Sequence, residues 1–216
     1  FPPRCASCRT LRGEDSAFPG SPLCPECRAK LPWLPPPGCR ICGNDAPSPD
    51  SLCGACAHRG SALSACHAAV ALERDAKAWI HRLKYPRPGL AGLDPAPLIV
   101  IREWIRVATA GAREPRPSWI VPVPLHPRRL RKRGFNVALL LAREVAHATK
   151  AQLHPGALVR IRDTPSQTGL DRRARQRNLR GAFVAPLTRP YPHSIWLVDD
   201  VVTTTATLQA AARALS

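Results

Sequence analysis

The stretch that decides the fold is Ile195-Trp196-Leu197-Val198-Asp199-Asp200-Val201-Val202-Thr203-Thr204-Thr205-Ala206-Thr207. Its first four residues are apolar, and the run is short and β-branched enough for a buried strand. Residues 208–215 have the composition of a helix. The polar residues between them therefore form a strand-to-helix turn, which is where open α/β sheets bind their ligands.

This turn combines two adjacent carboxylates with a threonine-rich loop. Asp199 and Asp200 can accept hydrogen bonds from neighbouring hydroxyls of a sugar. Backbone N–H groups that open the helix, together with threonine hydroxyls, can hold a phosphate. The simpler interpretation is that the two acids end a strand and cap the next helix. We favour a sugar-phosphate site, because the apolar run, the acidic pair and the threonine loop occur together in this order.

The segment resembles the phosphoribosyl-pyrophosphate (PRPP) signature of type I phosphoribosyltransferases. The resemblance implies that Asp199 and Asp200 hold the ribose hydroxyls, with Mg²⁺ expected beside PRPP. It also implies that the 5′-phosphate is held by the loop residues Thr203, Thr204, Thr205, Ala206 and Thr207. The sequence departs from the family at Thr205, where glycine is usual. If the loop needs a positive φ there, a β-branched residue is strained, and its side chain would keep the phosphate at a distance.

Eight of the nine cysteines form four C-x-x-C pairs in the first sixty residues. Two such pairs complete a tetrahedral four-sulfur shell, so we expect two structural zinc ions. Sequential pairing gives one site of Cys5, Cys8, Cys24 and Cys27 and another of Cys39, Cys42, Cys53 and Cys56. A cross-braced pairing also fits the spacing. A disulfide framework is the alternative, which the absence of an apolar signal segment disfavours. The remaining Cys66 is expected to be a small core residue.

The length of 216 residues suits one α/β core preceded by a small module that metal must stabilise. We expect a double zinc ribbon at 1–60 and an α/β domain at 61–216. The chain has no methionine, so we expect it to be part of a longer protein whose sheet continues beyond Ser216. No run of about eighteen apolar residues is present, so we expect no membrane span and a cytoplasmic location.

The positive charge belongs to the second domain. Residues 61–216 carry 25 basic and ten acidic side chains, which is +15 of the formal +17. Each four-thiolate zinc site would carry about −2, so the ribbons are poor anchors for DNA. Two basic clusters stand out: Arg128, Arg129, Arg131, Lys132 and Arg133, and then Arg160, Arg162, Arg172, Arg173, Arg175, Arg177 and Arg180. They can line a site for a polyanionic small molecule, follow a nucleic-acid backbone, or do both.

The remaining pattern alternates between strands and helices. We expect strands at 67–72, 119–123 and 157–161, and helices at 75–84, 97–110 and 135–147. Such alternation is typical of a parallel sheet. The basic stretch Val121–Asn136 contains a loop that follows the strand at 119–123, so it faces the ligand-binding edge.

Three further stretches carry a second resemblance: Ile80–Tyr85, Val121–Asn136 with its Arg-Gly-Phe-Asn, and Thr164–Leu170 followed by Arg175–Phe183. With the cysteine pairs and the PRPP turn, they make nearly the whole chain similar to the ComF/GntX family of competence-associated phosphoribosyltransferase-like proteins. This implies a type I phosphoribosyltransferase-like α/β fold behind a double zinc ribbon. It also implies pyrophosphate-facing arginines, Arg128, Arg129, Arg131 and Arg133, and a hood over the site, Thr164, Gln167, Arg175 and Asn178.

The family resemblance implies a PRPP-binding protein that acts on single-stranded DNA during natural transformation, with DNA and other competence proteins as partners. The alternative is a metabolic phosphoribosyltransferase with an unidentified acceptor. The sequence shows no acceptor pocket and names no catalytic residue. Because fold does not fix function, transfer activity is left open.

Overall fold

The computed structural model describes residues 4–11, 21–34, 38–43, 46–48, 51–57, 61–85, 95–110, 112, 116–164, 172–186 and 190–216. The chain forms two compact units: Phe1–Leu34 with Ala69–Gly111, and Pro35–Ala68 with Ala112–Ser216. Each unit therefore contains two of the four C-x-x-C pairs and a part of the chain that follows them. The expected boundary at residue 60 concerns sequence modules and remains a prediction.

A parallel sheet of three strands lies at the centre of the second unit. The strands are β1 (Trp119–Pro122), β2 (Gln152–Leu153) and β5 (Ile195–Val198), in the order β2-β1-β5. β1 pairs with β5 from Trp119–Ile195 to Pro122–Val198. One residue further, the Val123 N–H donates to the Val198 carbonyl at 2.9 Å. The two strands end together, so the turns that follow them begin side by side.

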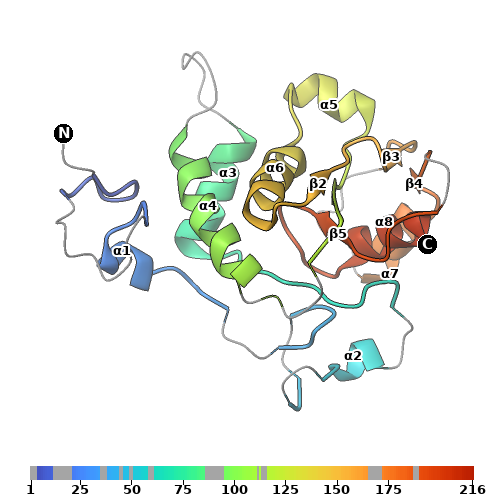
Figure 1. The fold of residues 1–216 in the computed structure, drawn as a ribbon, viewed down its shortest axis with the longest axis horizontal. Coiled ribbons are helices and arrows are strands. Elements are labelled where there is room, and N and C mark those ends of the chain that lie inside the picture. The colour runs from blue at the N-terminus through green and yellow to red at the C-terminus, as the bar shows by residue number, and fades with distance from the viewer. Residues whose placement is uncertain are drawn as a thin grey trace. The chain divides into compact units, whose positions relative to one another are not determined.

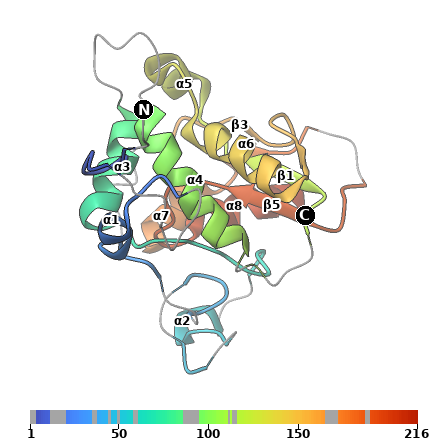
Figure 2. The ribbon, with the colours of Figure 1, turned by 60° about the vertical axis from the view of Figure 1, so that its left-hand side comes forward.

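Helices cover both faces of this sheet, which confirms the expected mixed α/β class. The helix α6 (Val137–Thr149) packs on all three strands, and α8 (Ala206–Leu215) packs on β5 from the opposite face (Figures 1 and 2). The helix α7 (Arg172–Leu179) packs against α8. Buried apolar side chains from these elements form one core, among them Val121, Ala138, Leu158, Leu179 and Leu208.

A second, antiparallel sheet consists of β3 (Val159–Arg160) and β4 (Phe183–Val184). The expectation that 157–161 adds a strand to the parallel sheet was wrong. Parallel strands that are buried on both faces are continuously apolar. Here Val159 and Ile161 are exposed and an arginine lies between them. β2, which does pair with β1, has only two residues and gave no sequence signal.

The first unit contains two packed helices, α3 (Arg74–Lys84) and α4 (Pro95–Ala110), as well as the short α1 (Pro25–Ala29). The predicted helices at 75–84 and 97–110 are confirmed. The predicted strand at 67–72 is not, because only Val70 makes an isolated bridge, to Trp33. The segment is rich in alanine, which has a low strand propensity. No helix within the described residues is long and apolar enough to cross a membrane.

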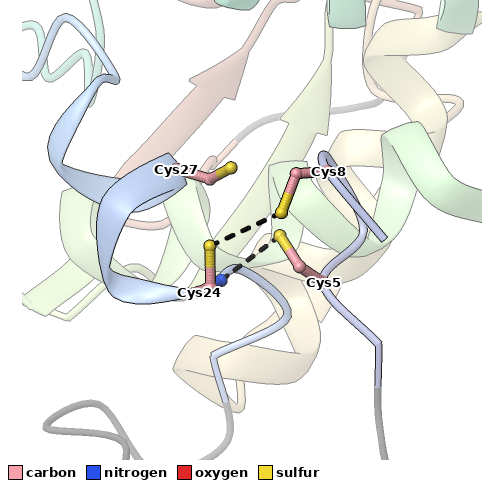
Figure 3. A group of neighbouring side chains, drawn as sticks. All are labelled: Cys5, Cys8, Cys24 and Cys27. Atoms are coloured by element: carbon pink, nitrogen blue, oxygen red, sulfur yellow. Dashed lines mark hydrogen bonds between the residues drawn. The ribbon is translucent and has the colours of Figure 1, made fainter. Parts of the chain in front are cut away.

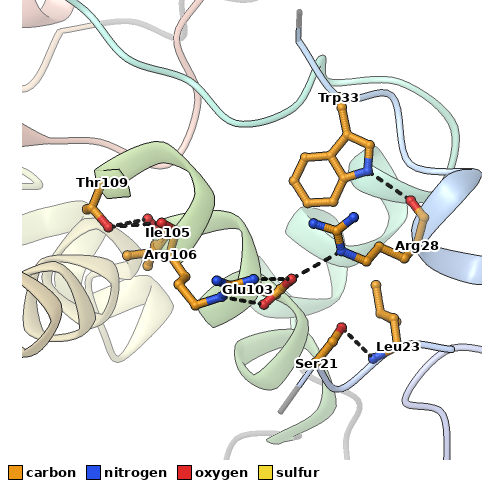
Figure 4. A network of polar contacts seen from close by, with 8 residues as sticks. All are labelled: Ser21, Leu23, Arg28, Trp33, Glu103, Ile105, Arg106 and Thr109. Atoms are coloured by element: carbon orange, nitrogen blue, oxygen red, sulfur yellow. Dashed lines mark hydrogen bonds and ion pairs between the residues drawn. The ribbon is translucent and has the colours of Figure 1, made fainter. Parts of the chain in front are cut away.

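A buried carboxylate on α4 joins α1 to α4 (Figure 4). Glu103 is only 4% exposed; it accepts hydrogen bonds from Arg106 at 3.0 Å and from Arg28 Nε at 3.2 Å. The Arg28 guanidinium also lies over the Trp33 ring, whose N–H donates to the Arg28 carbonyl at 2.8 Å. The hydrogen bond from Arg106, with a further one from Arg28, lowers the pKa of Glu103 despite its burial. The charged form therefore stabilises the first unit.

We expect Glu103→Gln to destabilise the first unit by about 1–2 kcal/mol at neutral pH, because the three hydrogen bonds from the two arginines lose their charged acceptor. A carboxyl group with a lowered folded pKa contributes stability above its unfolded pKa, and that stability is lost as the pH falls through the folded value. The difference between wild type and variant should therefore shrink below about pH 4. Unfolding midpoints measured for both proteins across this range test it. A difference that does not depend on pH would contradict an ionised Glu103.

Candidate functional site

The two cysteine clusters begin with the same kind of turn. In the first, the Arg9 N–H donates to the Cys5 carbonyl at 2.9 Å, and Arg9 has a φ of 64°. In the second, the Gly43 N–H donates to the Cys39 carbonyl at 2.7 Å, and Gly43 has a φ of 75°. The residue after each first C-x-x-C pair thus turns the chain back through the left-handed region, so that both thiols face one point.

The second half of each cluster is the start of a short helix. Cys24 precedes α1, and Cys53 precedes α2 (Gly54–Ala57). The four sulfur atoms of each cluster lie within 4.8 Å of one another, and Figure 3 shows those of the first cluster converging. The two groups are Cys5, Cys8, Cys24 and Cys27, and Cys39, Cys42, Cys53 and Cys56. This is the sequential pairing; the cross-braced alternative is not the arrangement found.

The spacing of the sulfur atoms fits zinc. Cys8 Sγ and Cys24 Sγ are 3.7 Å apart, as are Cys42 Sγ and Cys53 Sγ. A tetrahedral site with Zn–S bonds of about 2.3 Å has sulfur atoms about 3.8 Å apart. Hydrogen bonds from the Thr10 hydroxyl and backbone lower the pKa of Cys8 to about 6. The lowered value favours the thiolate of Cys8, the form that binds metal, whereas burial raises the pKa of Cys27 in the same cluster to about 12.

The ninth cysteine is not part of either cluster. Cys66 is half-buried and packs against the core of the second unit. Burial raises its pKa to about 11. Its thiol therefore stays protonated at neutral pH, as expected of a small core residue rather than a nucleophile.

The basic stretch after β1 is a helix, α5 (Pro127–Arg133), where the sequence suggested a loop. His126 caps it, with Nδ1 accepting from the Arg128 N–H at 3.3 Å. Gly134 ends it with a φ of 82°, and its N–H donates to the Leu130 carbonyl at 2.7 Å. Proline at the first helical position and glycine after the last are the usual signals of such a helix. The density of arginine obscured them.

Asn136 links the start of α6 to the end of β1. Its Nδ2 donates to the Val123 carbonyl at 3.0 Å, while its Oδ1 accepts from the Ala138 N–H at 3.1 Å and so caps α6. One side chain thus joins the residue after β1 to the start of α6. The Arg-Gly-Phe-Asn motif carried the resemblance, but its sequence gave no structural role for Asn136.

The arginines of α5 differ in their surroundings. Arg128 and Arg129 lie near Asp163, with nitrogen–oxygen distances of 3.6 and 3.7 Å. Arg131 is exposed and Arg133 is half-buried. The four predicted pyrophosphate-facing arginines therefore lie on one short helix, and the first two of them are next to a carboxylate.

The acidic pair begins the neighbouring turn. Asp199 and Asp200 are half-buried directly after β5, and Asp199 Oδ1 accepts from the Asp200 N–H at 2.8 Å. Of the following loop residues, Thr203 is exposed, Thr204 and Thr207 are half-buried, and Thr205 and Ala206 are buried. Thr205 has a φ of 57°, so the strain expected of a β-branched residue with a positive φ applies here. Its hydroxyl donates to the Thr204 carbonyl at 2.7 Å.

Thr205→Gly and Thr205→Ala form a matched pair that isolates this backbone strain. Both remove the buried side chain and its hydroxyl, but only alanine keeps a Cβ in the left-handed region, where it costs about 1–2 kcal/mol. We expect the glycine variant to be more stable than the alanine variant by about 1 kcal/mol, since glycine is also entropically costly. Urea unfolding of the two proteins measures the difference. Equal stabilities would mean that the loop relaxes and stores no strain.

Arg160, which the sequence placed only in the second basic cluster, is buried and interacts with residues of both turns. Arg160 on β3 is 5% exposed, and its guanidinium donates to Thr164 Oγ1 at 2.5 Å. Burial lowers its pKa, and so does Arg129, while Asp199 and Asp163 act in the opposite direction. Its Nε has no hydrogen-bond partner among the described residues. Arg160 is thus a buried charge that interacts with both acidic positions at this edge.

The predicted hood is described only in part. Thr164 is buried, and it accepts hydrogen bonds on its hydroxyl from Arg160 and on its carbonyl from Arg129. Asn178 is half-buried on α7. Arg175 also belongs to α7, but its side chain lies outside the described residues, as does the whole of Gln167. The structure thus brings Thr164 to α5.

Together, the fold and these sites define a class of protein: two four-cysteine zinc-ribbon clusters joined to an α/β domain with arginines and an acidic pair at one sheet edge. Residues 1–57 match the family described as double zinc ribbon domain. The chain is 32% identical over 177 residues to the DNA utilization protein YhgH of Salmonella typhi, covering 82% of this chain and 77% of that protein. The chain belongs to the ComF family, in which this relative and competence protein F are found.

Other relatives match shorter parts of the chain. The DNA utilization protein YhgH of Escherichia coli K12 is 35% identical over 136 residues, which are 63% of this chain and 59% of that protein. Competence protein F of Haemophilus influenzae is 34% identical over 102 residues, 46% of this chain and 44% of that protein. No solved structure matches the chain.

Proposed function

We propose that this protein binds PRPP with Mg²⁺ at the sheet edge where β1 and β5 end, and that it acts on single-stranded DNA during natural transformation. One observation carries the proposal. The arginine-rich α5 and the acidic turn follow adjacent parallel strands that end in register, as the hydrogen bond from Val123 to Val198 shows. Groups suited to a pyrophosphate and to a ribose thus begin from neighbouring positions.

The parts of PRPP differ in chemistry, and so do the residues assigned to them. Asp199 and Asp200 accept hydrogen bonds from the ribose hydroxyls or bind a bridging Mg²⁺, which prefers carboxylate oxygens. The loop residues 203–207 hold the 5′-phosphate, and the guanidinium groups of α5 bind the pyrophosphate. The hood begins at Thr164. The two zinc ions have all-cysteine shells with no open position, so their role is structural.

The DNA part of the proposal is supported by the relatives and by the charge. Relatives are named for DNA utilization and for competence. Residues 61–216 carry a net charge of +15. Arg128 and Arg131 are exposed and lie three residues apart on α5, so they share one face of the helix and can bind backbone phosphates there. PRPP and DNA then compete for the same guanidinium groups, because one fork cannot satisfy two phosphates at once.

We expect single-stranded DNA binding to weaken with salt by about 0.7 log units per neutralised phosphate for each tenfold rise in concentration. PRPP should displace the DNA. The double variant Arg131→Ala/Arg133→Ala should lower both affinities and flatten the salt dependence, as fluorescence anisotropy with a labelled oligonucleotide can measure. The matched control is Arg4→Ala/Arg9→Ala in the first ribbon, which should change neither. Loss of DNA binding in the control alone would move the DNA site to the ribbon.

Release of pyrophosphate from PRPP separates this proposal from a metabolic phosphoribosyltransferase. A panel of nucleobases and amines is offered as acceptors to the zinc-loaded protein. A ligand-binding competence protein should bind PRPP and release no pyrophosphate with any of them. Turnover with one acceptor would favour the metabolic enzyme and name its substrate.

A further inference from the structure

We propose that Asp163 occupies the place of the pyrophosphate in the ligand-free protein and competes with it for the arginines of α5. The inference rests on the proposed function, since it concerns the same PRPP site. Asp163 follows β3 and is not part of the acidic pair, the threonine loop or the arginine helix.

The position of Asp163 is that of a counter-ion. Its carboxylate oxygens lie 3.6 Å from Arg128 Nη1 and 3.7 Å from Arg129 Nε. The buried Arg160 also interacts with it electrostatically. One carboxylate thus serves three guanidinium groups, two of which are proposed to hold pyrophosphate. A diphosphate carries more charge and more acceptor oxygens than a carboxylate does, so it suits the same three groups better.

His126 also lies near Asp163. Its Nδ1 lies 3.7 Å from an Asp163 oxygen, which would be an ion pair if that nitrogen carried a proton. The same Nδ1 accepts a hydrogen bond from the Arg128 N–H at 3.3 Å, within hydrogen-bonding geometry. A ring nitrogen that accepts bears no proton. We therefore assign Nδ1 to the capping of α5, and the arginines are the permanent positive charges near Asp163.

Asp163 is held where it is by its neighbour. Thr164 is 3% exposed, and it is bound through its hydroxyl by Arg160 and through its carbonyl by Arg129. These two bonds fix the backbone directly after Asp163 against α5. The carboxylate is therefore presented to the arginines by a fixed backbone, and its nearness to them does not depend on a chance surface contact.

The ion pairs between the arginines and Asp163 are weak enough for another anion to replace the carboxylate. Both distances exceed those of a hydrogen bond, and the side chains of Arg128 and Asp163 are 74% and 34% exposed. An exposed ion pair of this kind contributes no more than about 1 kcal/mol, so competition from Asp163 lowers the affinity for an anion by no more than about fivefold. A pyrophosphate can thus displace Asp163, whereas a monophosphate gains less from doing so. The carboxylate lowers the affinity for every anion at this position and leaves the strongest competitor able to bind.

The test is calorimetric titration of the zinc-loaded protein with inorganic pyrophosphate and, separately, with ribose 5-phosphate. Asp163→Asn should bind pyrophosphate about fivefold more tightly than wild type, because the competitor is gone. Its affinity for ribose 5-phosphate, which is assigned to the loop at 203–207, should not change. Asp163→Glu keeps the charge and should resemble wild type. Asp75→Asn removes an exposed acid from α3 and controls for net charge.

The outcomes separate this inference from the proposed function. If wild type binds pyrophosphate and Asp163→Asn binds it equally or more weakly, the inference is wrong and the PRPP site stands. An equal gain for ribose 5-phosphate, or a similar gain in Asp75→Asn, would also overturn it, because a general change of charge would then be the cause. If neither wild type nor Asp163→Asn binds pyrophosphate or PRPP, the proposed function itself fails.

Discussion

Removal of zinc is expected to unfold the ribbon parts of both units. Elemental analysis should find two zinc ions in each chain, one for each four-cysteine cluster. Structural zinc contributes about 10–16 kcal/mol in small ribbons at neutral pH, which is more than a module with few buried apolar residues can lose. A strong chelator should therefore reduce the secondary structure and expose residues 1–57 to proteolysis. One ion per chain, or none, would contradict the double ribbon.

The two clusters can be separated because they belong to different compact units. Cys8→Ser should release one zinc ion and weaken the first unit, since Arg28 follows Cys27 and binds the buried Glu103. Cys42→Ser should release the other ion and weaken the second unit instead. Cys66→Ser is the control that should keep both ions. Hydrogen exchange of the backbone amides, resolved along the chain, measures the two units separately. If each variant lost amide protection equally in both units, the two units would not be independent.

The link between the second ribbon and its unit is direct. The Gln209 side chain on α8 donates to Ser61 Oγ at 2.6 Å and accepts from the Ala62 N–H at 2.9 Å. Leu63 packs on both the ribbon core and the α/β core. Loss of the second zinc ion should thus destabilise α8, the helix that follows the acidic turn. The sequence could not show this, because the three residues lie almost 150 positions from Gln209.

Sequence patterns predicted the elements whose residues share one environment. Residues 119–123 and 195–198 are continuously apolar, and both form strands of the parallel sheet. The helices at 75–84 and 97–110 have an apolar face, and the cysteine spacing identified both clusters. Where environments alternate, as they do around Arg160, the pattern predicted a strand but not its sheet. At 67–72, alanine made an apolar run that has no strong preference for a strand.

The candidate site was predictable only where its residues are neighbours in sequence. Asp199, Asp200 and the threonine loop form a continuous motif, and so do the arginines of α5. Arg160 and Asp163 reach the same edge from the antiparallel sheet, which tertiary packing places there. Their types and spacing are ordinary for a surface strand. Arg160 is distinguished by its burial, and Asp163 by its contacts with α5. A local sequence pattern predicts neither of these.

Replacing both acids of the turn, Asp199→Asn with Asp200→Asn, is expected to weaken PRPP binding by about ten- to hundredfold. Hydrogen bonds to charged acceptors contribute about 1.5–3 kcal/mol each, and neutral ones about half of that. Two such losses give about 1.5–3 kcal/mol, and each 1.4 kcal/mol is a factor of ten in affinity. Titration calorimetry with PRPP in the presence of Mg²⁺ measures the change. If the acids act by binding Mg²⁺, the loss should be smaller when Mg²⁺ is left out.

Asparagine is the appropriate replacement because it leaves the turn intact. Asp199 Oδ1 accepts from the Asp200 N–H at 2.8 Å, and the amide oxygen of asparagine can accept the same bond. Asp199 also stabilises the charge of the buried Arg160, so a loss of fold must be excluded by unfolding of the variant. Inorganic pyrophosphate supplies the binding control, since it is assigned to α5 and makes no contact with ribose-binding acids. Its affinity should not fall, because removing two negative charges near α5 can only lessen the repulsion of an anion. If pyrophosphate binding fell as far as PRPP binding, the acidic pair would be maintaining the edge as a whole rather than recognising the sugar.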